Sequence, residues 1–172
     1  MVPPTNLDSS AHPRVLELVG HFQSIAAQMR ELPIYNDGVP VVAHGFCGFG
    51  DNELIGVLLT PWFMNVMLLP CRFTALNMAE IGKRQNVDLP AGPRIFIVGG
   101  DQVIGRHRAH SLHSPVLQFR LPGQAEAEAK RAFAALMQAP PASPQASGAI
   151  DRRTLFVGRR AVVCPTDGQS GG

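Results

Sequence analysis

The sequence predicts an α+β fold, in which a mainly antiparallel sheet built from hairpins packs with about three helices. Helical patterns occupy residues 12–32, 73–84 and 124–138, and short apolar runs bounded by turn residues lie between them. Because the connections between successive runs are short, we expect the strands to pair antiparallel. The length of 172 residues fits one domain, and a chain of this size buries a core without disulfides or a structural metal.

The clearest element is the first helix, which should begin near Pro13 because the fixed φ of proline suits a first helical turn. Apolar residues then recur at steps of one, three or four, which is the spacing of one helix face; they are Val15, Leu16, Val19, Phe22, Ile25, Ala26, Met29 and Leu32. The helix should stop at Pro33, and a short strand-like run follows at residues 39–43.

The first hairpin is predicted near the middle of the chain. Residues 54–60 and 64–69 are short apolar runs separated by Pro61-Trp62-Phe63, and runs of this length suit two strands better than one helix. The Gly-rich segment 45–50 before them matches neither a dinucleotide-binding pattern nor a P-loop, so we interpret it as a turn.

A second hairpin is predicted after a Pro- and Gly-containing break at residues 89–93. Residues 94–98 are rich in β-branched side chains, and a return strand over residues 106–112 would complete the pair. The helix at residues 73–84 would place Lys83 and Arg84 near the negative end of its dipole. The last helix, at 124–138, is rich in Ala and Glu.

The predicted domain organisation is one domain with a tail at each end. Residues 1–11 are polar and form the expected flexible N-terminal tail, and residues 161–172 form the C-terminal tail. The domain spans residues 12–160 and contains a linker at 139–150, where Pro, Ser and Ala dominate the composition. A short apolar strand is expected at 154–157, inside the domain and after the linker.

The composition limits the classes of partner that we expect for this protein. With Lys+Arg 15 against Asp+Glu 13, the formal net charge is only +2, so we expect neither nucleic acid nor an anionic membrane as partner. The uncharged stretch between Glu53 and Arg72 contains glycine and prolines and falls short of the ~20 apolar residues of a membrane helix. Charged residues are 16% of the chain, below the roughly 25% of average soluble domains, which favours a protein-binding surface.

The cysteines and the N-terminus point to the cytoplasm. Cys47, Cys71 and Cys164 are widely spaced and form no Cys-x-x-Cys pair, so no zinc, rubredoxin or thioredoxin-type site is predicted. Unpaired thiols fit a reducing compartment. The first residues lack the basic and apolar regions of a signal peptide, and we predict a cytoplasmic protein.

Three histidines, His107, His110 and His113, are spaced by three and could together hold a first-row metal if the segment were helical. The alternative is a polar strand face, where only His107 and His113 would share a side. Arg106 and Arg108 would repel a cation, and no carboxylate or cysteine nearby in sequence completes a site. We therefore predict no bound metal and no cofactor.

Cys47 is the one candidate nucleophile. A base such as His44 would have to lie beside it, because thiolate formation needs a basic or cationic neighbour. A small cytosolic thiol enzyme centred on Cys47 is therefore the alternative function, and a buried, inert thiol is the other interpretation of the same residue. No serine-hydrolase elbow or His-Glu-x-x-His motif occurs in the sequence.

Two segments are candidate partner-binding sites. Trp62, between Pro61 and Phe63 at the predicted turn, is either a core residue or a partner contact. Two arginines stand on each side of the predicted strand at 154–157; they are Arg152, Arg153, Arg159 and Arg160. This segment is either a solvated strand or an edge at which the arginines bind carboxylates of a partner.

Several blocks occur in a fixed order, from Pro40 to Arg160. They are Pro40 with Gly45-Phe46, Gly56-Val-Leu-Leu-Thr-Pro-Trp-Phe-Met64, Leu89-Pro-x-Gly92 with Phe96-Ile-Val-Gly99, Ser111-Leu-x-Ser-Pro115, and Arg152-Arg-x-Leu-Phe-x-Gly-Arg-Arg160. In order and spacing these blocks resemble the HybE/HupJ family of nickel-iron hydrogenase maturation chaperones over residues 12–160. Family members often carry an acidic residue directly after the Val-Gly, where this chain has Gly100 and then Asp101.

This resemblance implies a non-catalytic accessory chaperone. Its expected client is the precursor of the hydrogenase large subunit, with other maturation proteins as further candidates, and its role is to support assembly before subunit pairing and export. Longer HupJ-type members carry a C-terminal rubredoxin with paired Cys-x-x-Cys motifs, and no such motif follows Cys164, so bound iron is not expected. The client contacts are expected at the Pro61-Trp62-Phe63 turn and at the four arginines.

Overall fold

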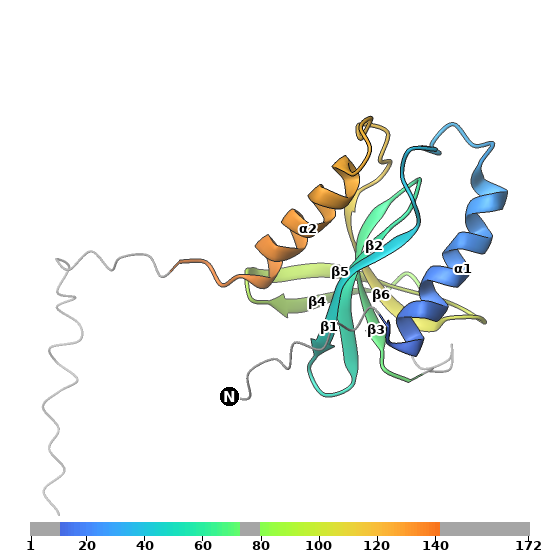
Figure 1. Ribbon diagram of the computed structural model, residues 1–172. Coiled ribbons are helices and arrows are strands. Elements are labelled where there is room, and N and C mark those ends of the chain that lie inside the picture. The colour runs from blue at the N-terminus through green and yellow to red at the C-terminus, as the bar shows by residue number, and fades with distance from the viewer. Residues whose placement is uncertain (1–10, 73–79, 142–172) are drawn as a thin grey trace, which may run out of the picture. The chain divides into compact units, whose positions relative to one another are not determined.

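The computed structural model describes residues 11–72 and 80–141 (Figure 1). The elements in chain order are α1 (Pro13–Met29), β1 (Val42–Phe49), β2 (Glu53–Leu59), β3 (Met64–Pro70), β4 (Arg84–Leu89), β5 (Gly92–Asp101), β6 (Gly105–His113) and α2 (Gln124–Met137). The chain divides into two units, residues 1–140 and 141–172, and all of these elements belong to the first. The division lies inside the segment predicted as a linker.

The strands form one antiparallel sheet of six in the order β1-β2-β3-β6-β5-β4. Four neighbouring pairs are hairpins, and the pair β3 and β6 joins the two halves of the sheet. The prediction of an α+β fold with a hairpin-built antiparallel sheet is confirmed. The described residues contain two helices, where about three were expected.

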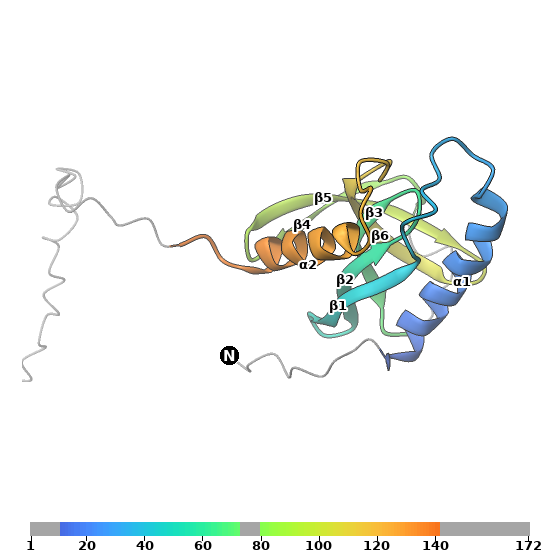
Figure 2. The ribbon, with the colours of Figure 1, turned by 45° about the horizontal axis from the view of Figure 1, so that its top comes forward.

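Each face of the sheet has its own apolar core because side chains alternate along a strand. On β2, Leu54 and Leu58 pack in the core under α1, whereas Ile55 and Val57 pack in the core under α2. Figures 1 and 2 show the helices on the two sides of the strands. This arrangement explains why β2 is buried nearly throughout and reads as a continuous apolar run.

Helix α1 follows its prediction with two differences. Its N-cap is His12, whose Nδ1 accepts a hydrogen bond from the backbone N–H of Arg14 at 3.2 Å, and Pro13 opens the helix as expected. The helix ends at Met29, before the predicted stop at Pro33. Leu16, which was expected to face the core, is 58% exposed. The side of the first helical turns that faces the core carries Leu18 instead, which is fully buried.

The segment 45–50 was wrongly predicted as a turn, since most of it belongs to β1. The register between β1 and β2 shifts between His44 and Cys47, so that Gly45 and Phe46 together oppose Gly56. This is a β-bulge, and Gly45 supplies its left-handed φ of 65°. Glycines here serve the strand geometry, whereas the sequence pattern was interpreted as a break.

The prediction of a helix at 73–84 is wrong at its C-terminal end. Residues 73–79 lie outside the described part of the chain, but residues 81–82 form a turn and β4 begins at Arg84. The backbone of Gly82 and Lys83 already pairs with Val98 of β5. Lys83 and Arg84 therefore belong to a sheet edge and not to a helix terminus.

Candidate functional site

The Pro61-Trp62-Phe63 segment forms the turn between β2 and β3, and Thr60 fixes it. The Thr60 hydroxyl oxygen accepts from the backbone N–H of Phe63 at 3.0 Å, and the Thr60 N–H donates to the Phe63 carbonyl at 2.9 Å. Pro61 is buried, and its carbonyl accepts from the N–H of Asn36 at 2.8 Å. The turn is therefore held to the loop that follows α1.

An aromatic cluster surrounds this turn. Trp62 stacks on Tyr35 with ring centroids 6.2 Å apart and lies 6.4 Å from Phe22 of α1. Phe63 meets both Phe22 and Trp62 edge to face. Trp62 is only 8% exposed, whereas Phe63 is partly exposed. Of the three residues predicted to bind a partner, Phe63 is the one that reaches the surface.

The three histidines of β6 do not converge. The Nδ1 of His110 contacts the carbonyl of Ile95 at 2.9 Å, and its ring packs on Phe96. His113 contacts Glu128 of α2 at 3.2 Å. His107 lies at the other end of the strand, where burial lowers its pKa more than the carbonyl of Gly105 and the charge of Asp101 raise it. Within the described residues, no group of three or more His, Cys, Asp or Glu side chains could hold a metal ion.

Cys47 and His44 both lie on the β1 side that faces α2, opposite Ile55 and Val57. Burial raises the pKa of the Cys47 thiol, which keeps it protonated at neutral pH. Burial also lowers the pKa of His44, with opposing effects from Glu126 and Lys130, and its Nε2 is buried without a hydrogen-bond partner in the described residues. The two side chains thus share one face of β1, and burial favours the neutral form of each.

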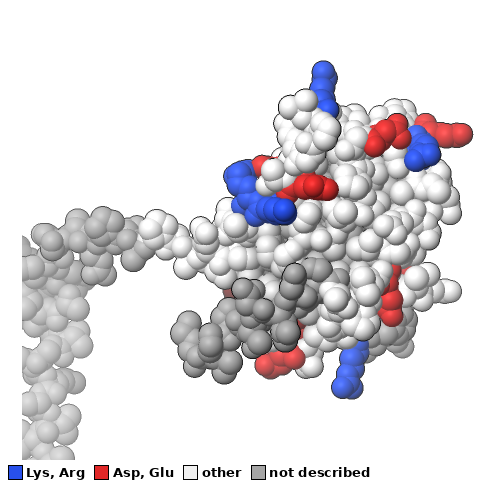
Figure 3. All heavy atoms as spheres, in the orientation of Figure 1, with Lys and Arg blue, Asp and Glu red and all other residues white. Residues whose placement is uncertain are grey.

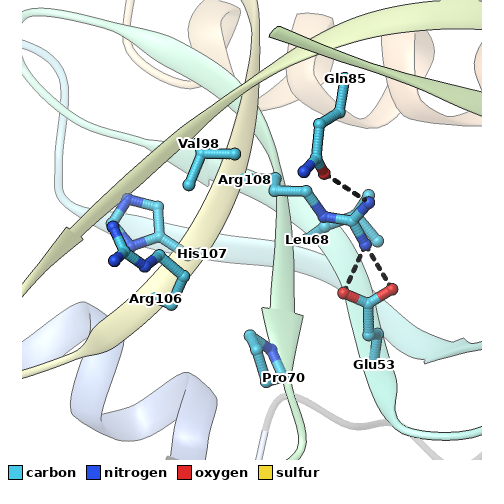
Figure 4. A pocket seen from close by; sticks show the side chains of 8 residues that line it. All are labelled: Glu53, Leu68, Pro70, Gln85, Val98, Arg106, His107 and Arg108. Atoms are coloured by element: carbon cyan, nitrogen blue, oxygen red, sulfur yellow. Dashed lines mark hydrogen bonds and ion pairs between the residues drawn. The ribbon is translucent and has the colours of Figure 1, made fainter. Parts of the chain in front are cut away.

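A pocket of about 120 Å³ is lined by side chains of the five strands β2 to β6 (Figure 4). Its lining residues are Glu53, Leu68, Pro70, Gln85, Val98, Arg106, His107 and Arg108. Arg108 extends between two polar neighbours: its Nη2 donates to both oxygens of Glu53 at 2.5 Å, and its Nη1 donates to Gln85 at 3.4 Å. These contacts cross from β2 through β6 to β4.

The sheet face on the α1 side is only partly covered. The core under α1 includes no described residue of β4 or β5, and Ile95 and Ile97 of β5 are 52% and 49% exposed there. Their neighbours on the edge strand β4, Arg84 and Asn86, are also exposed. Charged side chains on the face shown in Figure 3 are few and scattered. None of the described helices is long and apolar enough to span a membrane.

Comparison with known proteins identifies the family. The family described as NiFe-hydrogenase assembly, chaperone, HybE matches residues 13–158. The chain belongs to this family. The hydrogenase expression/formation protein HupJ of Bradyrhizobium diazoefficiens is 38% identical over 148 residues, which are 82% of this chain and 85% of that protein. The hydrogenase expression/formation protein HoxT of Azotobacter vinelandii is 37% identical over 147 residues, which are 83% and 92% of the two chains.

The HybE fold is shared as well. The solution structure of HybE from Escherichia coli matches with a TM-score of 0.58 and 21% sequence identity, over 92% of this chain and 91% of that chain. The resemblance drawn from the sequence blocks is thus confirmed, and this HybE-family chain is a hydrogenase formation chaperone.

Most of the HybE-family blocks have structural roles. Gly45, Phe46 and Gly56 meet at the β1 bulge, and the Thr60 turn holds Trp62 in the core. Asp101, displaced by one position from the acidic residue of the family pattern, closes the turn between β5 and β6. Its Oδ1 accepts from the N–H groups of Val103 and Ile104 at 2.8 and 2.7 Å, and its Oδ2 contacts His21 at 2.8 Å.

The remaining predicted site residues are four arginines near the end of the chain. Arg152, Arg153, Arg159 and Arg160 lie outside the described residues. No sequence pattern indicated the pocket residues, and the only role predicted for Arg106 and Arg108 was to repel a metal cation. The sequence signal that could indicate this site is Glu53, a charged residue at the start of the otherwise apolar strand β2.

Proposed function

We propose that this HybE-family chain acts as an accessory chaperone in the maturation of a NiFe hydrogenase, binding the immature large subunit before subunit pairing and export. The observation that carries the proposal is the family match over residues 13–158, which includes the whole described sheet and both helices. Other maturation proteins are further candidate partners.

The surface supports a role in protein binding. Ile95 and Ile97 are exposed side by side on a sheet face next to the edge strand β4, and exposed apolar patches of this kind mark interaction surfaces. Edge strands also offer unpaired backbone groups to an extended partner segment. A client that has not completed its folding presents such apolar and extended segments.

We further propose that the protein is not an enzyme and that it works in the cytoplasm. The raised pKa of Cys47 argues against the alternative of a thiol enzyme, because the neutral thiol is a poor nucleophile. Cys47 and Cys71 are both free, which suits a reducing compartment.

The client contacts are proposed at two places. The first is the Pro61-Trp62-Phe63 turn, where Trp62 backs the partly exposed Phe63. The second is the arginine-rich segment with Arg152, Arg153, Arg159 and Arg160, whose guanidinium groups would pair with client carboxylates.

The test is copurification of the large-subunit precursor with a tagged full-length chain from cells that make the hydrogenase. The double variant Arg159→Ala/Arg160→Ala should retain less precursor, and its difference from the unchanged chain should shrink as the salt concentration rises, because salt screens the ion pairs that the unchanged chain makes. The matched control is Arg30→Ala/Arg120→Ala, which removes two exposed arginines of the described domain. Equal retention by both double variants would remove Arg159 and Arg160 from the contact surface, and absence of precursor with the unchanged chain would refute the proposed client.

A further inference from the structure

Arg106 is a buried cation without an acidic partner among residues 11–72 and 80–141. The residue is 8% exposed, and its Nε and Nη1 atoms are buried with no hydrogen-bond partner in the described part of the chain. No acid of the described residues forms an ion pair with it. A guanidinium stays charged at any physiological pH, and an uncompensated buried charge is strongly unfavourable. The structure therefore leaves a positive charge at this place for which the described residues supply no counter-ion.

The nearby acids are already engaged. Glu53, which lines the same pocket, gives both of its oxygens to Arg108. Asp101 accepts two backbone hydrogen bonds in its own turn and contacts His21. Since Glu53 and Arg108 neutralise each other and burial favours the neutral form of His107, the lining retains about one net positive charge, that of Arg106.

The size and lining of the pocket select the class of ligand. Its volume of about 120 Å³ is near the roughly 150 Å³ of a cavity that accepts benzene, and well below the roughly 300 Å³ at which drug-sized ligand sites begin. The lining retains only about one positive charge, which suits a monoanion better than a dianion such as phosphate. Leu68, Pro70 and Val98 offer apolar contacts to the stem of a small acid.

We propose that this pocket binds a single carboxylate group on a short apolar stem, with the guanidinium of Arg106 as its counter-ion. The carboxylate comes either from a free small acid or from an acidic side chain of another protein, and both present the same chemistry to the pocket. The inference stands apart from the proposed chaperone role, since it rests on the burial of Arg106 and the shape of the pocket.

The experiment is an NMR titration of the ¹⁵N-labelled full-length chain with two pairs of probes. Propionate and its neutral counterpart propionamide test a free acid, and the blocked residues acetyl-Glu-methylamide and acetyl-Gln-methylamide test an acidic side chain. At least one acid should shift the amide signals of Gln85 and of residues 106–108 in a saturable way, in the millimolar range expected for so small a ligand. The neutral counterparts should leave these signals unchanged.

The variant Arg106→Met should weaken this binding at least tenfold, whereas Arg84→Met, which removes an exposed arginine of β4, should leave it unchanged. Saturable binding of propionate alone identifies a free acid as the ligand, and binding of the glutamyl probe alone identifies a protein side chain. If Arg106→Met does not fold, Arg106→Lys and Arg106→Gln are compared in its place. Arg106→Lys keeps the positive charge on a shorter, differently shaped group, so it should weaken binding less than Arg106→Gln. Absence of saturable shifts with both acids, or equal binding by the Arg106 variants, overturns the proposal.

Discussion

The ring of Phe46 lies directly over Gly56, so that a Cβ atom at Gly56 would be 2.4 Å from two ring atoms and 2.8 Å from the Cα of Phe46. Phe46 reaches this place because the bulge in β1 turns it into the core under α1, where it is 3% exposed. A glycine on β2 thus makes room for an aromatic ring on β1. The contact joins two of the sequence blocks that carry the family resemblance.

Replacement of this glycine should be costly. Gly56→Ala should lower the free energy of unfolding by about 1–3 kcal/mol, because both the ring and the backbone of Phe46 would have to move. Urea unfolding of the purified chain measures the change. The control is Gly48→Ala on the neighbouring strand, where an added Cβ meets nothing within 4 Å and the effect should stay within about 0.5 kcal/mol. Equal stability of the two variants would contradict the close approach.

Stability should fall as the pH drops below about 6.5, because burial lowers the pKa of His44 and His107 in the folded chain. In this window the unfolded chain binds protons that the folded chain does not, so protonation favours unfolding until the pH passes below the folded pKa values. His44→Phe should reduce the slope of stability against pH, since it removes one of the two groups. Urea unfolding between pH 7.5 and 5.5 tests this, and an unchanged slope would contradict it.

Asp101 should contribute stability that is lost at acid pH. Burial alone would raise its pKa, but the N–H groups of Ile104 and Val103, helped by His21 and His107, lower the pKa overall. The carboxylate is therefore stabilising above its unfolded pKa near 4, and the effect disappears as the pH falls through the lower folded value.

Asp101→Asn should consequently cost about 1 kcal/mol at pH 7, a value reduced for the 40% exposure of this side chain, and less at pH 3. Asp88→Asn, an exposed aspartate of β4, is the matched control and should change little at either pH. Unfolding curves at both pH values measure the differences. A cost for Asp101→Asn that is the same at both pH values would show that its charge plays no part.

Cys47 should be dispensable for function and slow to react. Because burial raises its pKa, alkylation by iodoacetamide at pH 7.5 should be slower than that of a free cysteine peptide. Cys47→Ala should leave hydrogenase maturation nearly intact. Loss of maturation at normal protein abundance would instead support the thiol-enzyme alternative.

The exposed isoleucines of β5 should matter for client binding and little for folding. Ile95→Ser/Ile97→Ser should change the stability by no more than about 0.5 kcal/mol per site, since both side chains are about half exposed, and should reduce copurification of the precursor. The control is Val103→Ser/Leu121→Ser, which alters two other exposed apolar residues. If both pairs reduce copurification equally, the β5 face has no special role.

Local patterns in the amino-acid sequence were enough to predict the class of the fold and the family. Helix α1, the hairpin around Trp62 and helix α2 follow from periodicity and turn residues, because these signals act within a few residues of the chain. The order and spacing of the sequence blocks were enough to indicate the HybE family, which the family match confirmed.

The contacts between residues far apart in the chain could not be predicted in this way. The glycines of segment 45–50 have the composition of a turn, and their place in β1 depends on Phe46 packing over Gly56 of another strand. Arg106 and Arg108 are two positions apart on β6 and similar in sequence context, yet Arg108 pairs with Glu53 and Arg106 is buried without a partner acid among the described residues. Burial and charge pairing depend on contacts between residues about 50 positions apart, as for Glu53 and Arg108, and no local pattern encodes such contacts.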